Sequence, residues 1–355
     1  MSLTFHHVTL GQRVLFGAGQ AATHLAEEID RLSAERVMVI ASPREMDRAR
    51  EMFAGIEVAV WHDDIAMHVP VEVADRARDA ARLGHVDLLV TVGGGSAVGT
   101  AKAVSLTSGL PQVAVPTTYA GSEATNVWGM TEAGRKVTGT DDVVLPVSVI
   151  YDSELTLSLP VGLSVASGFN GIAHCVDSLW APRVDPITAA LATEGARALA
   201  AGLPQIVEDP AAVDGRDQAL YGAYLAAVSF ASAGSGMHHK LCHILGGTFN
   251  LPHAQTHAVV LPYVLAFNAP HAPAAEARLA TAFGAPTALA GLQDLRQRLD
   301  APRSLAELGF TAEGIPAVVE QALEAVPDSN PREVTADNLT ALLTAALQGA
   351  DPAGG

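Results

Sequence analysis

The first part of the chain alternates short apolar runs with stretches of helical periodicity. Continuous apolar runs bounded by polar residues are typical of strands that are buried on both faces of a parallel sheet. The runs that predict strands are Arg36–Ala41, Val86–Val92, Gln112–Pro116 and Val147–Tyr151. Between them, Val71–Leu83 carries apolar residues on one helical face and charges on the other, which predicts an amphipathic helix. Strand and helix signals in this order predict parallel βαβ units.

The pattern changes near Leu159-Pro160, where strand signals end and long helical patterns begin. Proline, glycine and aspartate clusters separate these patterns. The predicted helical segments are Pro186–Ala201, Asp217–Ala233, Ala258–Asn268, Ala274–Phe283, Thr287–Leu299, Ile315–Ala325 and Ala336–Leu347. The sequence therefore predicts an α/β nucleotide-type domain over residues 1–159 and an all-helical domain over residues 160–355.

Composition limits the possible binding partners and the possible cellular compartment. The formal net charge of −17 argues against nucleic acid and anionic membranes as partners. No apolar run reaches the roughly 18 residues of a membrane span, and the first residues lack the basic and apolar regions of a signal peptide. With only two cysteines, this predicts a cytoplasmic protein. In so acidic a chain, an anionic ligand would need local positive charge. The chain has three lysines, Lys102, Lys136 and Lys240, and each lies beside a motif described below.

A glycine-rich turn follows the predicted strand Val86–Val92 and opens a helix, with the sequence VGGGSAVGTAK from Val92 to Lys102. Glycines let the backbone approach a pyrophosphate, and a helix N-terminus offers unpaired N–H groups. The spacing is neither the Gly-x-Gly-x-x-Gly fingerprint nor a Walker loop, so a tight turn without a ligand is the alternative. We expect Gly94, Gly95 and Ser96 to contact a phosphate-bearing cofactor.

Two further loops follow predicted strands at the end where open α/β sheets bind ligands. The loop after Pro116 carries the hydroxyl groups of Thr117 and Thr118. After the first predicted strand, the position that often recognises the adenosine ribose is Ser42, with Arg44 nearby and no acid. A small hydroxyl beside an arginine permits a 2′-phosphate, so we expect both NADH and NADPH to serve.

Histidines concentrate in the third quarter of the chain. His239 and His243 lie four residues apart, as do His253 and His257, and this spacing puts each pair on one face of a helix. Pro252 precedes the second pair and suits a helix start. Clustered histidines with helical spacing are typical of a metal site or a proton-handling site. The alternative is that they are core or surface histidines whose hydrogen bonds are satisfied within the protein.

Asn170 and His174 repeat this four-residue spacing. Joined to His239 and His253, they resemble the four-ligand pattern of the iron-containing alcohol dehydrogenase family, and the glycine-rich turn matches that family in order and spacing. The resemblance covers nearly the whole chain. It implies a dehydroquinate-synthase-like architecture, with a dinucleotide-binding N-terminal domain, a helical C-terminal domain and the active site in the cleft between them. It also implies a homodimer.

The chain departs from the family pattern at several positions. Asn170 stands where the family has an aspartate, Gly99 replaces an aspartate of the turn, and the loop after Pro116 is shorter. With Leu157–Pro160 and Leu179–Pro182, these departures are similar to the maleylacetate reductases, a branch of the family that acts in aromatic-ring degradation. That branch reduces the C=C bond of maleylacetate, a small dicarboxylate, to give 3-oxoadipate.

The loss of the aspartate bears on metal binding. An amide oxygen is a weak ligand for a divalent transition metal, so we expect no metal, although His174, His239 and His253 could still bind Zn²⁺ or Fe²⁺ weakly. Conjugate reduction needs hydrogen-bond donors at a developing oxyanion and a proton donor to carbon. A neutral amide and a cationic histidine cluster would suit a dianionic substrate better than a carboxylate would.

The resemblance also implies roles for single residues. His243 matches the family's catalytic histidine and is the preferred proton donor. Lys136 matches a family lysine near the cofactor, with a surface hairpin charge as the alternative. The residues expected to line the substrate pocket, the imidazoles as donors to the oxyanion or the carboxylates, are Asn170, His174, His239 and His253. A metal-dependent alcohol or polyol dehydrogenase, a lyase that holds NAD tightly and a non-catalytic nucleotide-binding protein are the alternatives.

Overall fold

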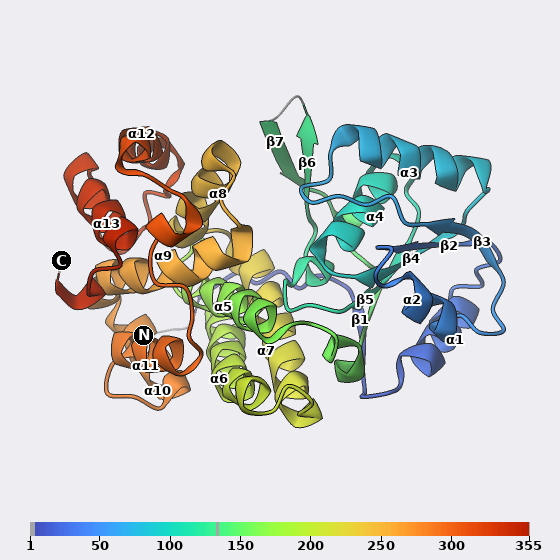
Figure 1. The fold of residues 1–355 in the computed structure, drawn as a ribbon, viewed down its shortest axis with the longest axis horizontal. Coiled ribbons are helices and arrows are strands. Elements are labelled where there is room, and N and C mark those ends of the chain that lie inside the picture. The colour runs from blue at the N-terminus through green and yellow to red at the C-terminus, as the bar shows by residue number, and fades with distance from the viewer. Residues whose placement is uncertain (1–3, 133–134, 355) are drawn as a thin grey trace. The chain divides into compact units, whose positions relative to one another are not determined.

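The computed structural model describes residues 4–132 and 135–354, with the backbone alone at residues 135, 136 and 354. The chain forms two compact units (Figure 1). One unit is Thr9–Leu159, and the other is Pro160–Gly355 together with Met1–Val8. The chain therefore passes between the units at residue 8 and again at residue 159.

The unit Thr9–Leu159 contains a six-stranded sheet of order β1-β8-β5-β4-β2-β3 and a separate two-stranded sheet. The pairings of the larger sheet are parallel, as the alternation of strands and helices predicts. The elements are β1 (Arg13–Phe16), α1 (Ala21–Arg31), β2 (Val37–Ala41), α2 (Met46–Met52), β3 (Val58–His62), α3 (Val71–Leu83), β4 (Leu88–Gly93), α4 (Gly95–Ser108), β5 (Gln112–Pro116), β6 (Val127–Glu132), β7 (Arg135–Thr140) and β8 (Ser148–Tyr151).

Helices cover both faces of the six-stranded sheet. Along β2, Val37 and Val39 pack with residues of α1 and α2. Met38 and Ile40 point to the opposite face and pack with residues of α3 and α4. Because neither face meets water, the buried strands read as unbroken apolar runs in the sequence.

The register of the sheet brings three loops to one edge. Gly93 at the end of β4 pairs with Pro116 at the end of β5. Ala41 at the end of β2 pairs with Val92 of β4. The loops after these three neighbouring parallel strands therefore leave the same edge, where open α/β sheets bind their ligands.

Within the described residues, the unit Pro160–Gly355 is built from helices, as predicted. They are α5 (Val161–Ser178), α6 (Pro186–Glu208), α7 (Val213–Ala233), α8 (Met237–Phe249), α9 (His253–Asn268), α10 (Pro273–Phe283), α11 (Ala288–Arg298), α12 (Ile315–Ala325) and α13 (Ala336–Gln348). α5 is buried along most of its length and contacts α6, α7, α8 and α9. Across the described part of the chain, none of the helices has the length and hydropathy needed to cross a membrane.

Candidate active site

A pocket of about 310 Å³ is lined by the three loops at the edge of the sheet. The predicted cofactor residues that line it are Ser42, Gly94, Gly95, Ser96, Thr117 and Thr118. The structure thus brings six of the seven together, because their loops follow adjacent strands. The seventh, Lys136, belongs to β7, and its side chain lies outside the part of the chain that the structure describes.

The turn after β4 needs glycine at two positions. Gly93 has a φ of 151°, which side chains disfavour. A Cβ atom on Gly94 would lie 2.9 Å from Cγ2 of Thr118, so glycine lets these two loops approach. α4 begins at Gly95 without a side-chain cap, which leaves N–H groups of its first turn for an anion. These features fit the pyrophosphate of a dinucleotide.

Lys102 ties α4 to the segment that follows the Thr117 loop. Its Nζ donates to the carbonyl oxygens of Ser122, Thr125 and Val127 at 2.7, 2.8 and 2.7 Å. The side chain is 1% exposed, and burial lowers the pKa of its ammonium group to about 7, against the attraction of Glu123. Lys102 is therefore a buried structural tie and not the anion-attracting charge that its position beside the turn indicates.

Six imidazoles, here called the histidine group, gather in the helical unit. They are His174 on α5, His238, His239 and His243 on α8, and His253 and His257 on α9. His174 stacks on His239 with ring centroids 4.8 Å apart. His257 lies 4.8 Å from His239 and 4.5 Å from His253. The predicted histidines meet because α8 and α9 pack against each other and against α5.

Four members of the histidine group are neutral at pH 7. Burial, reinforced by neighbouring imidazoles, lowers the pKa of His174 to about 4 and that of His238 to about 3. The pKa values of His239 and His257 fall well below the ordinary value for the same reason. The predicted cationic cluster is therefore wrong for these four residues, because a buried imidazolium would lose its hydration.

The exposed rim of the group is formed by His243 and His253, whose rings stack with centroids 6.1 Å apart. Asn170 lies one turn before His174 on α5 and is 4% exposed. Its Oδ1 atom has no hydrogen-bond partner among the described residues. A buried polar atom without a protein partner is typical of a place where a ligand or an ordered water binds.

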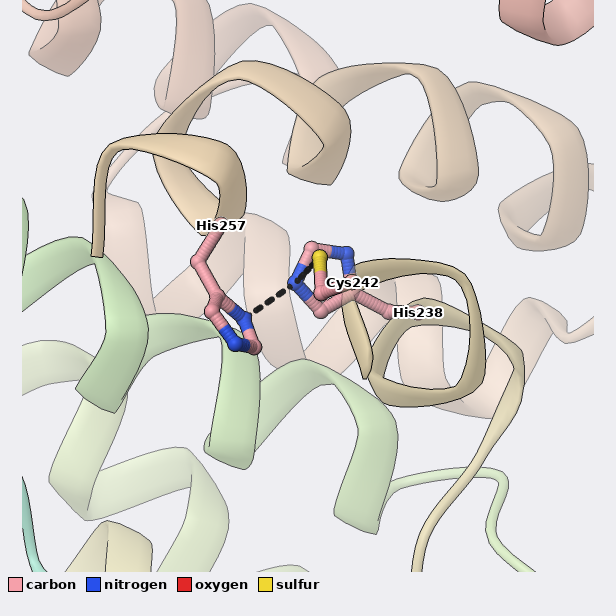
Figure 2. Close-up of side chains that lie close together, drawn as sticks. All are labelled: His238, Cys242 and His257. Atoms are coloured by element: carbon pink, nitrogen blue, oxygen red, sulfur yellow. Dashed lines mark hydrogen bonds between the residues drawn. The ribbon is translucent and has the colours of Figure 1, made fainter. Parts of the chain in front are cut away.

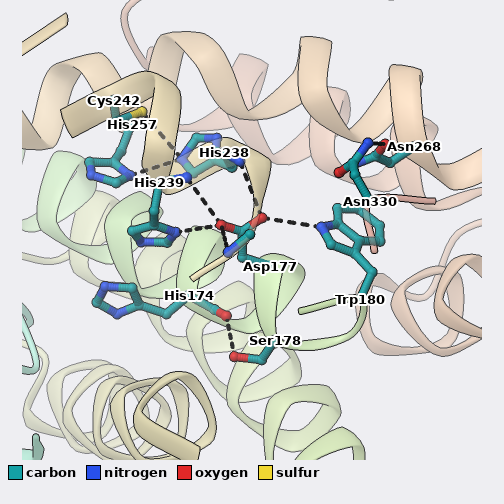
Figure 3. Close-up of polar contacts among 11 residues, drawn as sticks. His174, Asp177, Ser178, Trp180, His238, His239, Cys242, His257, Asn268 and Asn330 are labelled. Atoms are coloured by element: carbon teal, nitrogen blue, oxygen red, sulfur yellow. Dashed lines mark hydrogen bonds and ion pairs between the residues drawn. The ribbon is translucent and has the colours of Figure 1, made fainter. Parts of the chain in front are cut away.

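Asp177, which the sequence analysis missed, is a fully buried carboxylate at the centre of the polar contacts in Figure 3. Its five donors are the N–H groups of Gly236, His238 and His239 at 3.1, 3.3 and 3.0 Å, the indole of Trp180 at 3.1 Å and Nδ1 of His239 at 2.8 Å. Asp177 lies three residues after His174 and therefore shares its helical face. This spacing was the sequence signal that could have identified Asp177.

His238, Cys242 and His257 form a compact group within the histidine-rich region (Figure 2). Their ligand atoms lie within 4.8 Å of one another, a spacing that a metal ion could use. The two imidazoles instead share a hydrogen bond of 2.8 Å, and Cys242 Sγ lies 3.6 Å from His238 Nε2. Burial raises the pKa of the thiol well above its ordinary value, so the group is neutral and bonded internally.

A nucleotide-type parallel sheet followed by a helical unit with a histidine group is the arrangement that the resemblance to a family of oxidoreductases implies. The chain belongs to the iron-containing alcohol dehydrogenase family. A family model described as iron-containing alcohol dehydrogenase matches residues 11–153, and the model of the C-terminal part of the Fe-containing alcohol dehydrogenase family matches residues 164–347. The predicted resemblance to this family is confirmed.

The more similar proteins include maleylacetate reductases. The maleylacetate reductase of Burkholderia cepacia is 46% identical over 96% of this chain and 97% of its own length. The crystal structure of maleylacetate reductase from Rhizobium sp. strain MTP-10005 is 44% identical, with a TM-score of 0.92 over 98% of this chain and 99% of that one. A crystal structure of an iron-containing alcohol dehydrogenase from Corynebacterium glutamicum is 63% identical, with a TM-score of 0.98 over 99% of each chain. The resemblance to this branch is therefore confirmed too.

The family's name raises the question whether this chain binds iron. The side chains at the family's four ligand positions bear on that question. At the four positions of the family pattern, Asn170, His174, His239 and His253 offer an amide and imidazoles but no carboxylate. The buried carboxylate of Asp177 already accepts five hydrogen bonds. Because this set lacks the anionic ligand of the family pattern, it should hold Fe²⁺ or Zn²⁺ less tightly than that pattern does.

Proposed function

We propose that the chain is a maleylacetate reductase, which reduces the C=C bond of maleylacetate to give 3-oxoadipate in the degradation of aromatic compounds. The observation that supports this most directly is an identity of 42–47% to maleylacetate reductases over nearly the whole chain. The neutral Asn170 agrees with this function, because a carboxylate beside the histidine group would repel a dianionic substrate.

We propose NADH or NADPH as the reductant. The pocket at the edge of the sheet offers the glycine-rich turn and the uncapped start of α4 to the pyrophosphate. Arg44 lines the same pocket as Ser42, which supports binding of a 2′-phosphate as well as a free ribose. When bound, the reduced nicotinamide supplies the hydride.

The roles of the histidine group follow from what the reaction needs. Hydride addition to the alkene moves negative charge to the ketone oxygen, and a proton must then reach carbon. We assign the proton transfer to His243, because it lies on the exposed rim where a solute can meet it. Asn170 and His253 are assigned to binding the oxygen atoms of the substrate. The predicted location of the reaction, between the two domains, stays a prediction.

We also propose that activity needs no metal, and that the enzyme is a cytoplasmic homodimer. The neutral donor set at Asn170 supports the first point. The two cysteines, Cys175 and Cys242, are free thiols, which is expected of a reducing compartment. Light scattering during size-exclusion chromatography measures the oligomeric state directly.

The decisive experiment follows the absorbance of NADH and of NADPH with maleylacetate, beside a panel of alcohols and polyols with the oxidised cofactors. We expect rapid oxidation of the reduced cofactor with maleylacetate and slow or no reaction with the alcohols. An enzyme that ignores maleylacetate and oxidises an alcohol only when Fe²⁺ or Zn²⁺ is added would instead be a metal-dependent alcohol dehydrogenase.

A further inference from the structure

Asp177 and His239 form a buried pair in the middle of the histidine group. Oδ2 of Asp177 lies 2.8 Å from Nδ1 of His239, and the two residues are 0% and 2% exposed. A carboxylate can only accept a hydrogen bond, so Nδ1 is the donor and carries the ring proton. A second ring proton on Nε2 would be a buried donor without an acceptor among the described residues, so the ring keeps a lone pair there.

The second nitrogen of His239 meets no hydrogen-bonding group in the described part of the protein. Nε2 is buried and has no hydrogen-bond partner within the described residues. The ring is held by its stacking on His174 and by the Asp177 contact (Figure 3). Sequence reasoning made His239 a donor to an oxyanion, whereas this geometry makes Nε2 an acceptor.

The same carboxylate also fixes the backbone that carries the ring. α8 has Gly236 at its N-cap position and no side-chain cap of its own. Asp177, from α5, takes the place of the missing cap by accepting the N–H groups of Gly236, His238 and His239. One buried group thus sets both the start of α8 and the proton position on His239.

We propose that Asp177 is a positioning residue that locks His239 in its Nδ1–H tautomer and so presents Nε2 as a hydrogen-bond acceptor to the O–H group of a water bound beside the substrate. The pairing resembles the carboxylate–imidazole pairs of hydrolases, in which the carboxylate holds the ring and its tautomer. The catalytic part of this proposal rests on the proposed function, and the tautomer does not.

Asp177→Asn keeps the shape of the side chain and removes the lock. An amide that turns its NH₂ group toward Nδ1 forces the ring proton onto Nε2. We expect kcat for maleylacetate to fall by about 10²–10⁴-fold, as when the carboxylate of such a pair is replaced by an amide, with little change in KM for NADH.

Asp185→Asn is the matched control. Asp185 is a buried carboxylate that caps α6 through the N–H groups of Ile187 and Thr188, and it holds Nδ1 of His7 at 2.9 Å. It repeats the architecture of Asp177 outside the histidine group. We expect Asp185→Asn to lower the melting temperature without lowering kcat. An equal fall of kcat in both variants would show that Asp177 is merely structural and would overturn the proposal.

The tautomer is read directly by ¹⁵N NMR of histidine-labelled protein, with the His239 signals identified by their loss in His239→Gln. This measurement uses a chain with Asp177 in place, so it tests the proposed tautomer of His239 even if Asp177→Asn does not fold. A protonated Nε2 in the wild type would overturn the proposal, and an unprotonated Nε2 supports it. A wild-type enzyme inactive on maleylacetate would refute the proposed function and leave the tautomer result standing.

Discussion

Nε2 of His238 and Nδ1 of His257 lie 2.8 Å apart and share one hydrogen bond between α8 and α9. Both side chains are fully buried. One ring must donate and the other must accept, so the contact exists only while the acceptor ring is neutral. Protonation of the acceptor would set two N–H groups against each other where no water can solvate the charge.

This contact predicts a fold that weakens in acid. Burial lowers the pKa of His238 from 6.5 to about 3. Between these values the unfolded chain binds a proton that the folded chain does not. The free energy of unfolding should therefore fall as pH drops below about 6.5, by up to about 1.4 kcal/mol per pH unit for this residue alone. Urea unfolding of the wild type and of His238→Gln measures the slope, which should be shallower in the variant; equal slopes would contradict the prediction.

Replacing the proposed proton donor should slow the chemical step. His243→Ala is expected to lower kcat by about 10²–10⁴-fold, because general acid catalysis by a positioned side chain contributes about that much. His271→Ala, which changes an exposed histidine outside the histidine group, is the control and should leave kcat unchanged. Steady-state kinetics with maleylacetate compares the two, and an unaltered rate in His243→Ala removes this residue from the role.

The buried lysine makes a separate prediction about cofactor binding. Lys102→Met leaves the buried carbonyl oxygen of Thr125 and two partly buried carbonyl oxygens without their donor, so the free energy of unfolding should fall by about 1–3 kcal/mol. The loosened segment follows the Thr117 loop, so KM for NADH should rise as well. Thr107→Met places the same side chain at an exposed position of α4 and controls for the helix. A variant with unchanged stability and KM would show that the tie is unimportant.

Sequence reasoning succeeded where the signal is local. The amphipathic period over 71–83 and the apolar run over 112–116 match α3 and β5. It missed β1 and β3, because β1 has four residues with an exposed arginine at its start, and β3 is mostly half-buried at an edge of the sheet. Neither strand forms the continuous apolar run that marks a strand covered on both faces.

The properties of the candidate site also divide into those that the local sequence predicts and those that depend on tertiary packing. Spacing on α8 and α9 predicts that the histidines share helical faces, because that property depends on sequence separation alone. The role of Asp177 depends on the packing of α5 against α8, and the charge state of His174 depends on burial. Both are tertiary properties, so the predicted positive charge was wrong for the four buried histidines, although the predicted histidines do gather in one place.

Chelation tests the need for a metal. We expect activity with maleylacetate to persist after treatment with EDTA, because the positions of the family pattern supply no carboxylate ligand. Elemental analysis before and after treatment shows whether any ion was removed. Loss of activity that Fe²⁺ or Zn²⁺ restores would establish a metal requirement and refute the metal-free mechanism.

Asn170→Asp restores the carboxylate of the family pattern. We expect it to strengthen metal binding and to weaken substrate binding. The added negative charge supplies an anionic ligand beside the imidazoles of the histidine group, so affinity for Zn²⁺ or Fe²⁺ should rise. The same charge repels a dianionic substrate, and a repulsion of about 1.4 kcal/mol raises KM for maleylacetate roughly tenfold. Asn170→Ala, which removes the amide without adding charge, separates repulsion from the loss of a hydrogen-bonding group. A lower KM for maleylacetate in Asn170→Asp would show that Asn170 does not meet the substrate.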